Sequence, residues 1–216
     1  MSFSNFGNLK AAIASFADRT DKTSQIPDYI TLATTRILYG STEPPYASEP
    51  LRIRFMETSA TLTFNAQQVA LPAGYLQMRR LMITGDSGGK LNLISPDQFW
   101  LKYTVSQSGR PIEYAIEGEN ILLGPSPDAT YTGKMLYYKA FDTLEETEDT
   151  NWLLENAPGV YLQGALIELW DDLKDYEAKA EAHKAFVGLV NSLNKADQAD
   201  RWSGSPWVGK PDVYTP

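Results

Sequence analysis

Apolar residues recur at helical spacing in two stretches near the C-terminal end of the chain. One face of the first stretch carries Leu162, Leu166, Leu169 and Leu173, and one face of the second carries Ala182, Phe186, Leu189, Leu193 and Ala196. No Gly or Pro separates them, but Leu173 and Ala182 would lie on roughly opposite sides of one continuous helix at about 100° per residue. We therefore predict a break between the stretches and an antiparallel helix pair between residues 158 and 200.

The same period predicts two further helices at the start of the chain. Phe6, Leu9, Ile13 and Phe16 share one face, and so do Ile26, Ile30, Ala33 and Ile37. Pro27 suits a first helical turn, and Gly40 is a suitable C-terminal stop. We expect helices over residues 6–16 and 26–37.

Between residues 50 and 141 the period changes to two. Ala60, Leu62 and Phe64 alternate with threonines, as in a strand with one buried face. Further strands are expected at residues 69–71, 76–84, 90–93, 112–116, 121–123 and 131–139, with turns at 85–89, 118–120 and 125–127. Ser95 followed by Pro96 predicts a short capped helix inside this region. Residues 142–150 are acidic and unpatterned, which is typical of an exposed linker.

These elements predict an α+β fold in three parts. Residues 1–49 and 151–200 would form one helical bundle, and residues 50–150 would form an inserted β-rich domain with its linker. Residues 201–216 have three prolines, two glycines and neither period, so we expect an extended C-terminal arm.

Composition narrows the possible functions. The 216 residues include 19 basic and 27 acidic side chains, and the net charge of −8 argues against a grip on nucleic-acid phosphates. No apolar run approaches the ~18 residues that span a bilayer, and no signal peptide is evident, so we expect a cytoplasmic protein without membrane contact. With no cysteine and one histidine, His183, we expect no metal and no cofactor, and we place His183 on a helix surface.

Two glycine-rich patterns resemble catalytic or nucleotide-binding motifs. Residues 85–89 spell Gly-Asp-Ser-Gly-Gly, as around the nucleophile of trypsin-like proteases. That chemistry needs a histidine beside Ser87, and His183 follows the serine instead of preceding it. Gly89-Lys90 is followed by leucine rather than Ser or Thr, and Gly85 is one position too close to the lysine for a phosphate-binding loop. We interpret the stretch as a hairpin turn.

Charged clusters offer a third chemical possibility. Asp171, Asp172 and Asp175, or Glu145, Glu146, Glu148 and Asp149, contain candidates for a glycosidase carboxylate pair. Runs of acids usually lie on a solvated surface, which is the interpretation we favour. Arg79 and Arg80 would point to opposite faces of a strand, so a surface or subunit contact is favoured over a phosphate clamp.

The C-terminal arm carries bulky side chains that cannot form a core of their own, namely Trp202, Trp207, Val208 and Tyr214. They would either fold back on their own domain or act as anchors that become ordered on a partner. No cofactor or metal role follows for any of them, and we treat the four as candidate partner-binding residues.

Several local sequences, in order, resemble the adaptor proteins of tailed bacteriophages, also called head-to-tail connector or tail tubular proteins. They are Leu71-Pro-Ala-Gly-Tyr-Leu, Gly118-Glu-Asn-Ile-Leu-Leu-Gly-Pro-Ser-Pro, Leu136-Tyr-Tyr and Asn151-Trp-Leu-Leu-Glu-Asn-Ala-Pro. The resemblance implies a helical bundle with an inserted β domain and a ring, usually a dodecamer, beneath the portal protein. The ring would bind the next tail component, a nozzle or tail tube, and let genome DNA pass without specific binding. Trp202, Trp207, Val208 and Tyr214 would then dock on the portal.

The resulting hypothesis is a non-enzymatic structural adaptor, made in the host cytoplasm and located at the virion head–tail junction. Its acidic surface would repel the phosphate backbone of passing DNA. An enzyme that uses a carboxylate pair on carbohydrate or cell wall is the alternative, and a β-rich carbohydrate- or protein-binding module is a third hypothesis.

Overall fold

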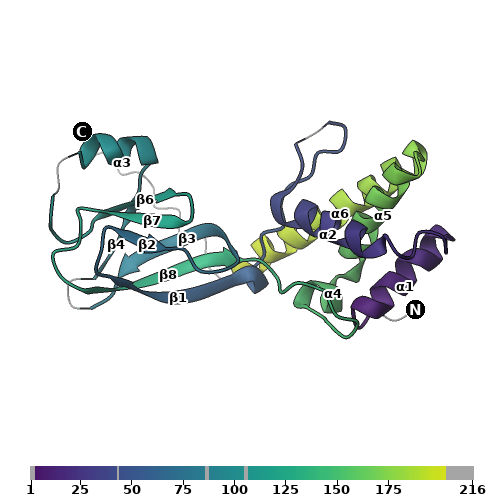
Figure 1. Cartoon of the computed structure of the whole chain (residues 1–216), viewed down its shortest axis with the longest axis horizontal. Coiled ribbons are helices and arrows are strands. Elements are labelled where there is room, and N and C mark those ends of the chain that lie inside the picture. Colours follow the sequence, from purple (N-terminus) through teal and green to yellow (C-terminus); the bar gives the residue numbers. More distant parts are fainter. Residues whose placement is uncertain (1–2, 43, 86–87, 105–106, 203–216) are drawn as a thin grey trace, which may run out of the picture. The chain divides into compact units, whose positions relative to one another are not determined.

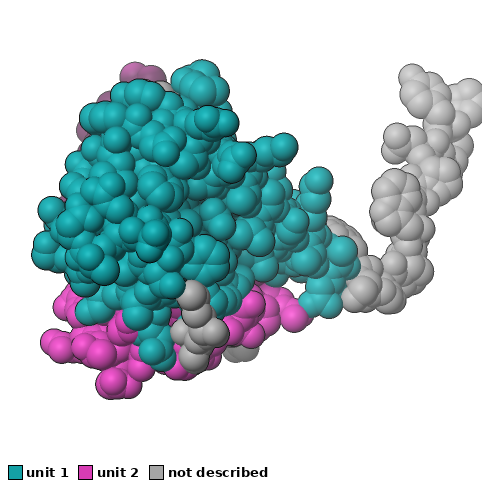
Figure 2. Space-filling view, turned by 90° about the vertical axis from the view of Figure 1, so that its right-hand side faces the viewer, with its two compact units in different colours: residues 1–3, 8–53, 157–216 teal, residues 4–7, 54–156 magenta. Residues whose placement is uncertain are grey.

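The computed structural model describes residues 3–42, 44–85, 88–104 and 107–202 of an α+β protein. The chain divides into two compact units (Figure 2). The helical unit comprises Met1–Phe3, Asn8–Ile53 and Ala157–Pro216, and the β-rich unit comprises Ser4–Gly7 and Arg54–Asn156. Each unit has buried apolar residues of its own.

The predicted helices are confirmed, with small changes at their ends (Figure 1). They are α1 (Phe6–Ala17), α2 (Ile26–Tyr39), α5 (Pro158–Asp172) and α6 (Tyr176–Trp202). Within the helical unit α5 packs against both α2 and α6. Pro27 lies in the first turn of α2, and Gly40 ends that helix with a φ of 71°, as expected of a glycine stop.

The predicted break between the two long helices is also confirmed. α5 ends at Asp172, and Lys174 has a left-handed φ of 60°. The Asp175 carboxylate then accepts a hydrogen bond from the Ala178 N–H at 3.1 Å and caps the start of α6. A capping aspartate therefore marks this turn instead of a glycine or proline. Asp175 is the residue in the sequence that could have indicated where α6 begins.

The face that α6 buries differs from the predicted one. Ala182 and Phe186 are buried, but Leu189 is 38% exposed and Ala196 is also exposed. His183 and Val190 are buried instead, so the placement of His183 on a helix surface is wrong. The reason is tertiary, because the segment between α2 and the β-rich unit covers the His183 side of α6 through Tyr46.

The β-rich unit contains two four-stranded sheets, with strand orders β1-β8-β3-β4 and β2-β7-β6-β5. The first holds β1 (Glu57–Phe64), β3 (Tyr75–Ile83), β4 (Gly89–Lys90) and β8 (Tyr131–Lys139), and the second holds β2 (Gln68–Ala70), β5 (Asn92–Leu93), β6 (Glu113–Glu117) and β7 (Asn120–Gly124). The β5–β6 pair is parallel, and the other strand pairs are antiparallel. The short elements η1 (Arg54–Met56), α3 (Pro96–Lys102) and α4 (Trp152–Asn156) complete the unit.

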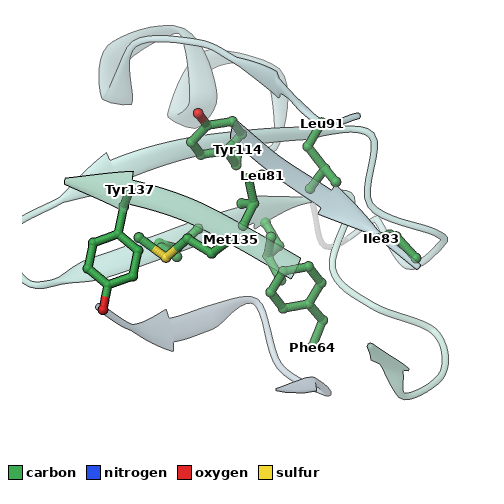
Figure 3. Close-up of a cluster of buried hydrophobic side chains, with 9 residues drawn as sticks. Phe64, Leu81, Ile83, Leu91, Tyr114, Met135 and Tyr137 are labelled. Atoms are coloured by element: carbon green, nitrogen blue, oxygen red, sulfur yellow. The ribbon is translucent and has the colours of Figure 1, made fainter. Parts of the chain in front are cut away.

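One apolar cluster lies between the two sheets (Figure 3). Phe64, Leu81 and Met135 reach it from the first sheet, and Tyr114 and Ile121 reach it from the second. The glycine at position 133 leaves room for the Phe64 ring, because a Cβ there would overlap that ring. On its other face the second sheet packs against Phe99 and Tyr103 at α3. The alternating burial read from the sequence thus corresponds to one shared core.

Most predicted strands are confirmed, and one is divided. The predicted strand at residues 90–93 is two short strands in different sheets, because the Leu91 side chain turns into the shared core between them. The predicted hairpin is confirmed by the pairs Met82 with Lys90 and Ile83 with Gly89. Ser95 caps α3 as expected, within a capping box completed by Gln98.

Candidate functional site

The predicted docking arm begins at residue 201, but Arg201 and Trp202 form the end of α6 and are therefore helical instead of extended. Trp202 is the last residue of α6, and its side chain lies outside the described residues, as do Trp207, Val208 and Tyr214. The base of the arm is described. The Arg201 Nε donates to the Asp197 Oδ2 at 2.6 Å, and Asp197 is 8% exposed. A charge-assisted bond to a buried carboxylate holds the last helical turn, so the arm starts from an ordered point.

One turn earlier, α6 fixes the chain segment that leads out of the helical unit. The Asn194 Oδ1 accepts from the Arg52 N–H at 3.0 Å, and the Asn194 Nδ2 donates to the Pro50 carbonyl at 3.3 Å. The Arg52 guanidinium donates to the Leu38 carbonyl at 2.9 Å, where a cation is favourable at the C-terminal end of α2. The final turns of α6 therefore support two features, the base of the arm and the exit at residues 50–52.

His183 is buried and not on the helix surface where it was expected. Its ring lies edge-on to Tyr46, with the ring centroids 5.1 Å apart. Burial lowers the pKa of His183, the charges of Arg36 and Lys179 act in the same direction, and a hydrogen bond with the Tyr46 backbone opposes them. The Lys179 Nζ stands 4.5 Å from the centre of the Tyr46 ring. The neutral imidazole therefore helps to hold Tyr46 against α6.

The candidate catalytic acids of the α5–α6 turn form ion pairs and caps. The Lys179 Nζ donates to the Asp171 Oδ1 at 2.7 Å, and this bond lowers the pKa of Asp171. Bonds from Lys22 and then Tyr29 lower the pKa of Asp172. With Asp175 occupied as a helix cap, this group offers ionised structural partners, whereas a glycosidase acid needs a raised pKa.

The acids of the linker are engaged in a similar way. The Asp149 carboxylate accepts the backbone N–H groups of Glu145 and Glu146, which lowers the pKa of Asp149. The Glu148 Oε2 accepts from the Asn5 side chain at 2.8 Å. The linker backbone also accepts the Phe6 and Gly7 N–H groups, so this segment anchors the start of the chain within the β-rich unit.

Each unit has a hollow among its described residues. The first, of about 510 Å³, is lined by residues 70–75 and 118–120, and the second, of about 600 Å³, is lined by residues 39, 41–42 and 47–50 together with Val187 and Asn191 of α6. Glu119 is the acid of the first hollow and Glu49 that of the second. Neither hollow therefore offers the pair of carboxyl groups that the enzyme alternative requires.

Two of the sequences that carry the phage-adaptor resemblance line the first hollow. The Leu71 N–H donates to the Glu119 carbonyl at 2.8 Å, which joins two of them. The Ala140 N–H donates to the Gly74 carbonyl at 2.8 Å, and Gly74 has a φ of 72° that favours glycine. The Tyr75 ring stacks on Tyr137 with centroids 5.9 Å apart. These contacts join the loop at residues 71–74 to the turn at Glu119 and to the end of β8, within the β-rich unit.

The fourth of those sequences forms α4 and its surroundings. The Asn151 Oδ1 accepts the Leu154 N–H and its Nδ2 donates to the Asp142 carbonyl, both at 3.0 Å. Beside it the Trp152 ring stacks on Phe55 with centroids 4.1 Å apart. Sequence reasoning missed this aromatic stack, because Phe55 lies outside any periodic pattern and is half exposed.

Arg79 and Ser87 are the remaining residues that the sequence offered as candidates for a functional site. The Arg79 Nε lies 3.2 Å from the Glu57 Oε1, and its guanidinium covers the Tyr138 ring at 5.5 Å, so Arg79 stays on the surface of the first sheet. Ser87 lies outside the described residues. Among the residues that the structure describes, no group of three or more His, Asp or Glu side chains could hold a metal ion. No described helix has both the length and the apolar character of a membrane span.

Comparison with known proteins identifies one family. The model of the family described as SU10 adaptor protein matches residues 4–209. The match covers both compact units and includes Trp202, Trp207 and Val208, whereas Tyr214 lies beyond it. No curated protein matches the chain.

Proposed function

The chain belongs to the SU10 adaptor protein family, and from this premise we propose that it is a non-enzymatic virion adaptor that joins the portal of a tailed phage to the tail. The observation that carries the proposal is the length of the family match, residues 4–209, which includes both units and the base of the arm. The ionised, paired state of Asp149, Asp171 and Asp172 supports a structural role.

The proposed assembly is a dodecameric ring around the DNA channel at the head–tail junction, which binds the next tail component on its far side. The proposal treats the helical bundle as the body of each subunit, the region at residues 50–150 as an inserted domain, and residues 201–216 as the portal-docking arm. A net charge of −8 per chain supports passage of DNA without adhesion, because acidic surfaces repel phosphates. Contacts repeated around a ring add up, so a short arm can hold firmly.

Trp202, Trp207, Val208 and Tyr214 supply the docking contacts in this proposal. Large aromatic side chains dominate many protein interfaces, and the prolines of the arm limit the entropy lost on ordering. The structure decides where a truncation should be made. A cut after Trp202 keeps Arg201, and hence the partner of the buried Asp197 carboxylate.

The test is binding of the purified chain to portal particles of the same phage. A chain that ends at Trp202 should keep its circular dichroism spectrum and thermal midpoint and lose portal binding. Trp207→Ala and Tyr214→Ala, which keep the arm at full length, should each weaken binding, whereas Lys210→Ala serves as a matched substitution within the arm. Undiminished binding by the truncated chain would show that the arm is not the docking element.

A further inference from the structure

Among the described strands, β1 lies at one edge of the first sheet. Within the described residues β8 is the strand that pairs with β1, and the pairing runs without a register shift from Glu57 with Tyr138 to Phe64 with Tyr131. Figure 1 draws β1 along the margin of the β-rich unit. In such a strand every second residue directs its N–H and C=O away from the sheet, where another strand can pair with them.

The opposite edge of the same sheet has the usual protection against pairing. There β4 covers only the last residues of β3, through Met82 and Ile83. The rest of β3 has two register shifts against β8 and carries Arg79 and Arg80. Bulges and charged side chains are the devices that prevent edge-to-edge association. β1 has neither over residues 58–64, and it contains no proline or glycine.

From this contrast we propose that β1 pairs antiparallel with β1 of a second copy of this chain, centred on Thr61. The partner strand follows by elimination among the other described edge strands. β2, β4 and β5 have only two or three residues, and the uncovered part of β3 is protected by its register shifts and arginines. β1 itself is the described strand that can match the full length of β1.

The sequence of β1 is self-complementary about Thr61. Side chains directly opposite each other in a ladder share a face, so the pairing sets Thr61 against Thr61 and Ser59 against Thr63 on the exposed face. On the core face it sets Ala60 against Leu62, and both are half-buried residues that would lose further contact with water. Serine and threonine pairs are favourable across strands, and no charge meets a like charge.

The charged end of the strand is also compatible with this register. Glu57 falls opposite position 65, which is the neutral Asn65. The two Glu57 carboxylates stand about 27 Å apart, from eight residues at about 3.4 Å each, which is well beyond the screening length at physiological salt. A register shifted by one residue would set core-facing residues of one copy opposite solvent-facing residues of the other, so the side-chain pattern favours registers in which opposite residues share the core face.

Such a contact is two-fold and forms pairs, whereas a ring around one axis is built from head-to-tail contacts. The inference therefore describes association of the free chain and does not depend on the proposed portal adaptor. Binding to portal can fail while β1 pairing holds, and the reverse is equally possible.

The register allows a sharp test, because the chain has no cysteine of its own. In Thr61→Cys two introduced thiols would be directly opposite, at a Cα separation of about 4.5–5.5 Å that a disulfide spans. In the matched control Thr63→Cys they would be four residues apart along the ladder, about 14 Å. Under mild oxidation Thr61→Cys should form a covalent dimer at least about tenfold faster than Thr63→Cys. A mixture of Ser59→Cys and Thr63→Cys chains should also cross-link.

Sedimentation of the unmodified full chain gives an independent measure. It should show a concentration-dependent dimer, and Thr61→Lys, which sets like charges opposite each other, should weaken that dimer by at least about tenfold. Thr132→Lys, on the exposed face of the central strand β8, should not weaken it. A chain that stays monomeric, equal cross-linking of Thr61→Cys and Thr63→Cys, or a dimer unaffected by Thr61→Lys would each overturn the proposal.

Discussion

Gly164 of α5 faces Ala33 of α2 so closely that a Cβ added to the glycine would stand 2.9 Å from the Cβ of the alanine. The same added carbon would lie 3.4 Å from the Phe186 ring of α6. Gly164 therefore sets how closely α5 approaches both of its neighbours. A small residue at a helix contact allows this approach, and a larger one forces the backbones apart.

Gly164→Ala should destabilise the chain although alanine is the better helix former. Overpacking typically costs about 1–3 kcal/mol, which exceeds the ~1 kcal/mol gained in helix propensity. Gly188→Ala in α6 is the matched control, because nothing lies within 4 Å of a Cβ at that position. That change should raise the free energy of unfolding by about 0.5–1 kcal/mol. Urea titration of both variants measures the difference, and equal effects would contradict the close packing.

Acidification should weaken the contact between His183 and Tyr46. The pKa of His183 is lowered in the folded chain, so the unfolded chain binds this proton more readily. The stability contributed by the neutral imidazole is complete above the unfolded pKa of about 6.5 and declines as the pH falls below it. His183→Gln, which cannot titrate, should flatten the slope of unfolding free energy between about pH 5 and 7. Proton NMR of the His183 ring reports its titration directly, and a midpoint above 6.5 would contradict this assignment.

The Arg201–Asp197 pair should stabilise the last turn of α6. Arg201→Ala leaves the buried Asp197 carboxylate without this partner and should cost on the order of 2 kcal/mol. Adding Asp197→Asn to Arg201→Ala should recover part of the loss, because the neutral amide is easier to bury. Thermal unfolding of the single and double variants measures the coupling between the two positions. Additive losses would show that the pair does not act as a unit.

Asn151 should stabilise α4 through both ends of its amide. Asn151→Ala removes the cap on the Leu154 N–H and the bond to the Asp142 carbonyl, and should cost about 1–3 kcal/mol. Asn151→Ser keeps a capping oxygen and loses the amide donor, so an intermediate cost is expected. Trp152 beside it gives a fluorescence signal that follows local opening. Identical behaviour of the two variants would mean that the cap contributes little.

The sequence predicts the elements of this fold well where the signal is local. β8 has the bounds expected from the sequence, Tyr131 and Lys139, and the capping box at Ser95 lies within four consecutive residues. The division of residues 90–93 between two sheets was not predictable in this way. It depends on whether Leu91 meets the core shared with Leu81 and Tyr114, and these lie elsewhere in the chain.

The candidate sites show the same limit. The aromatic content of the arm is evident from the sequence, and the family match extends through Trp207 and Val208. The Arg201–Asp197 pair is local, because its residues are four apart within α6. In contrast, the contact of His183 with Tyr46 depends on a segment that reaches α6 from a distant position in the chain. The phage-adaptor resemblance rests on local sequences in their order along the chain, and the hydrogen bond from the Leu71 N–H to the Glu119 carbonyl joins two of them in the structure.

Strand β1 illustrates what each level decides. Its uncharged alternation from Thr58 to Phe64 is a property of the sequence alone, because side-chain period follows from backbone geometry within a few residues. The sequence likewise determined the helix pair and its break, through the opposed faces of Leu173 and Ala182. Only the tertiary structure decided that β1 is an edge strand and that α6 buries His183. Whether a strand lies at a sheet edge, and which helix face is buried, depends on the distant segments that pack against that strand or helix. This packing minimises the exposed apolar surface of the whole chain and not that of any single stretch.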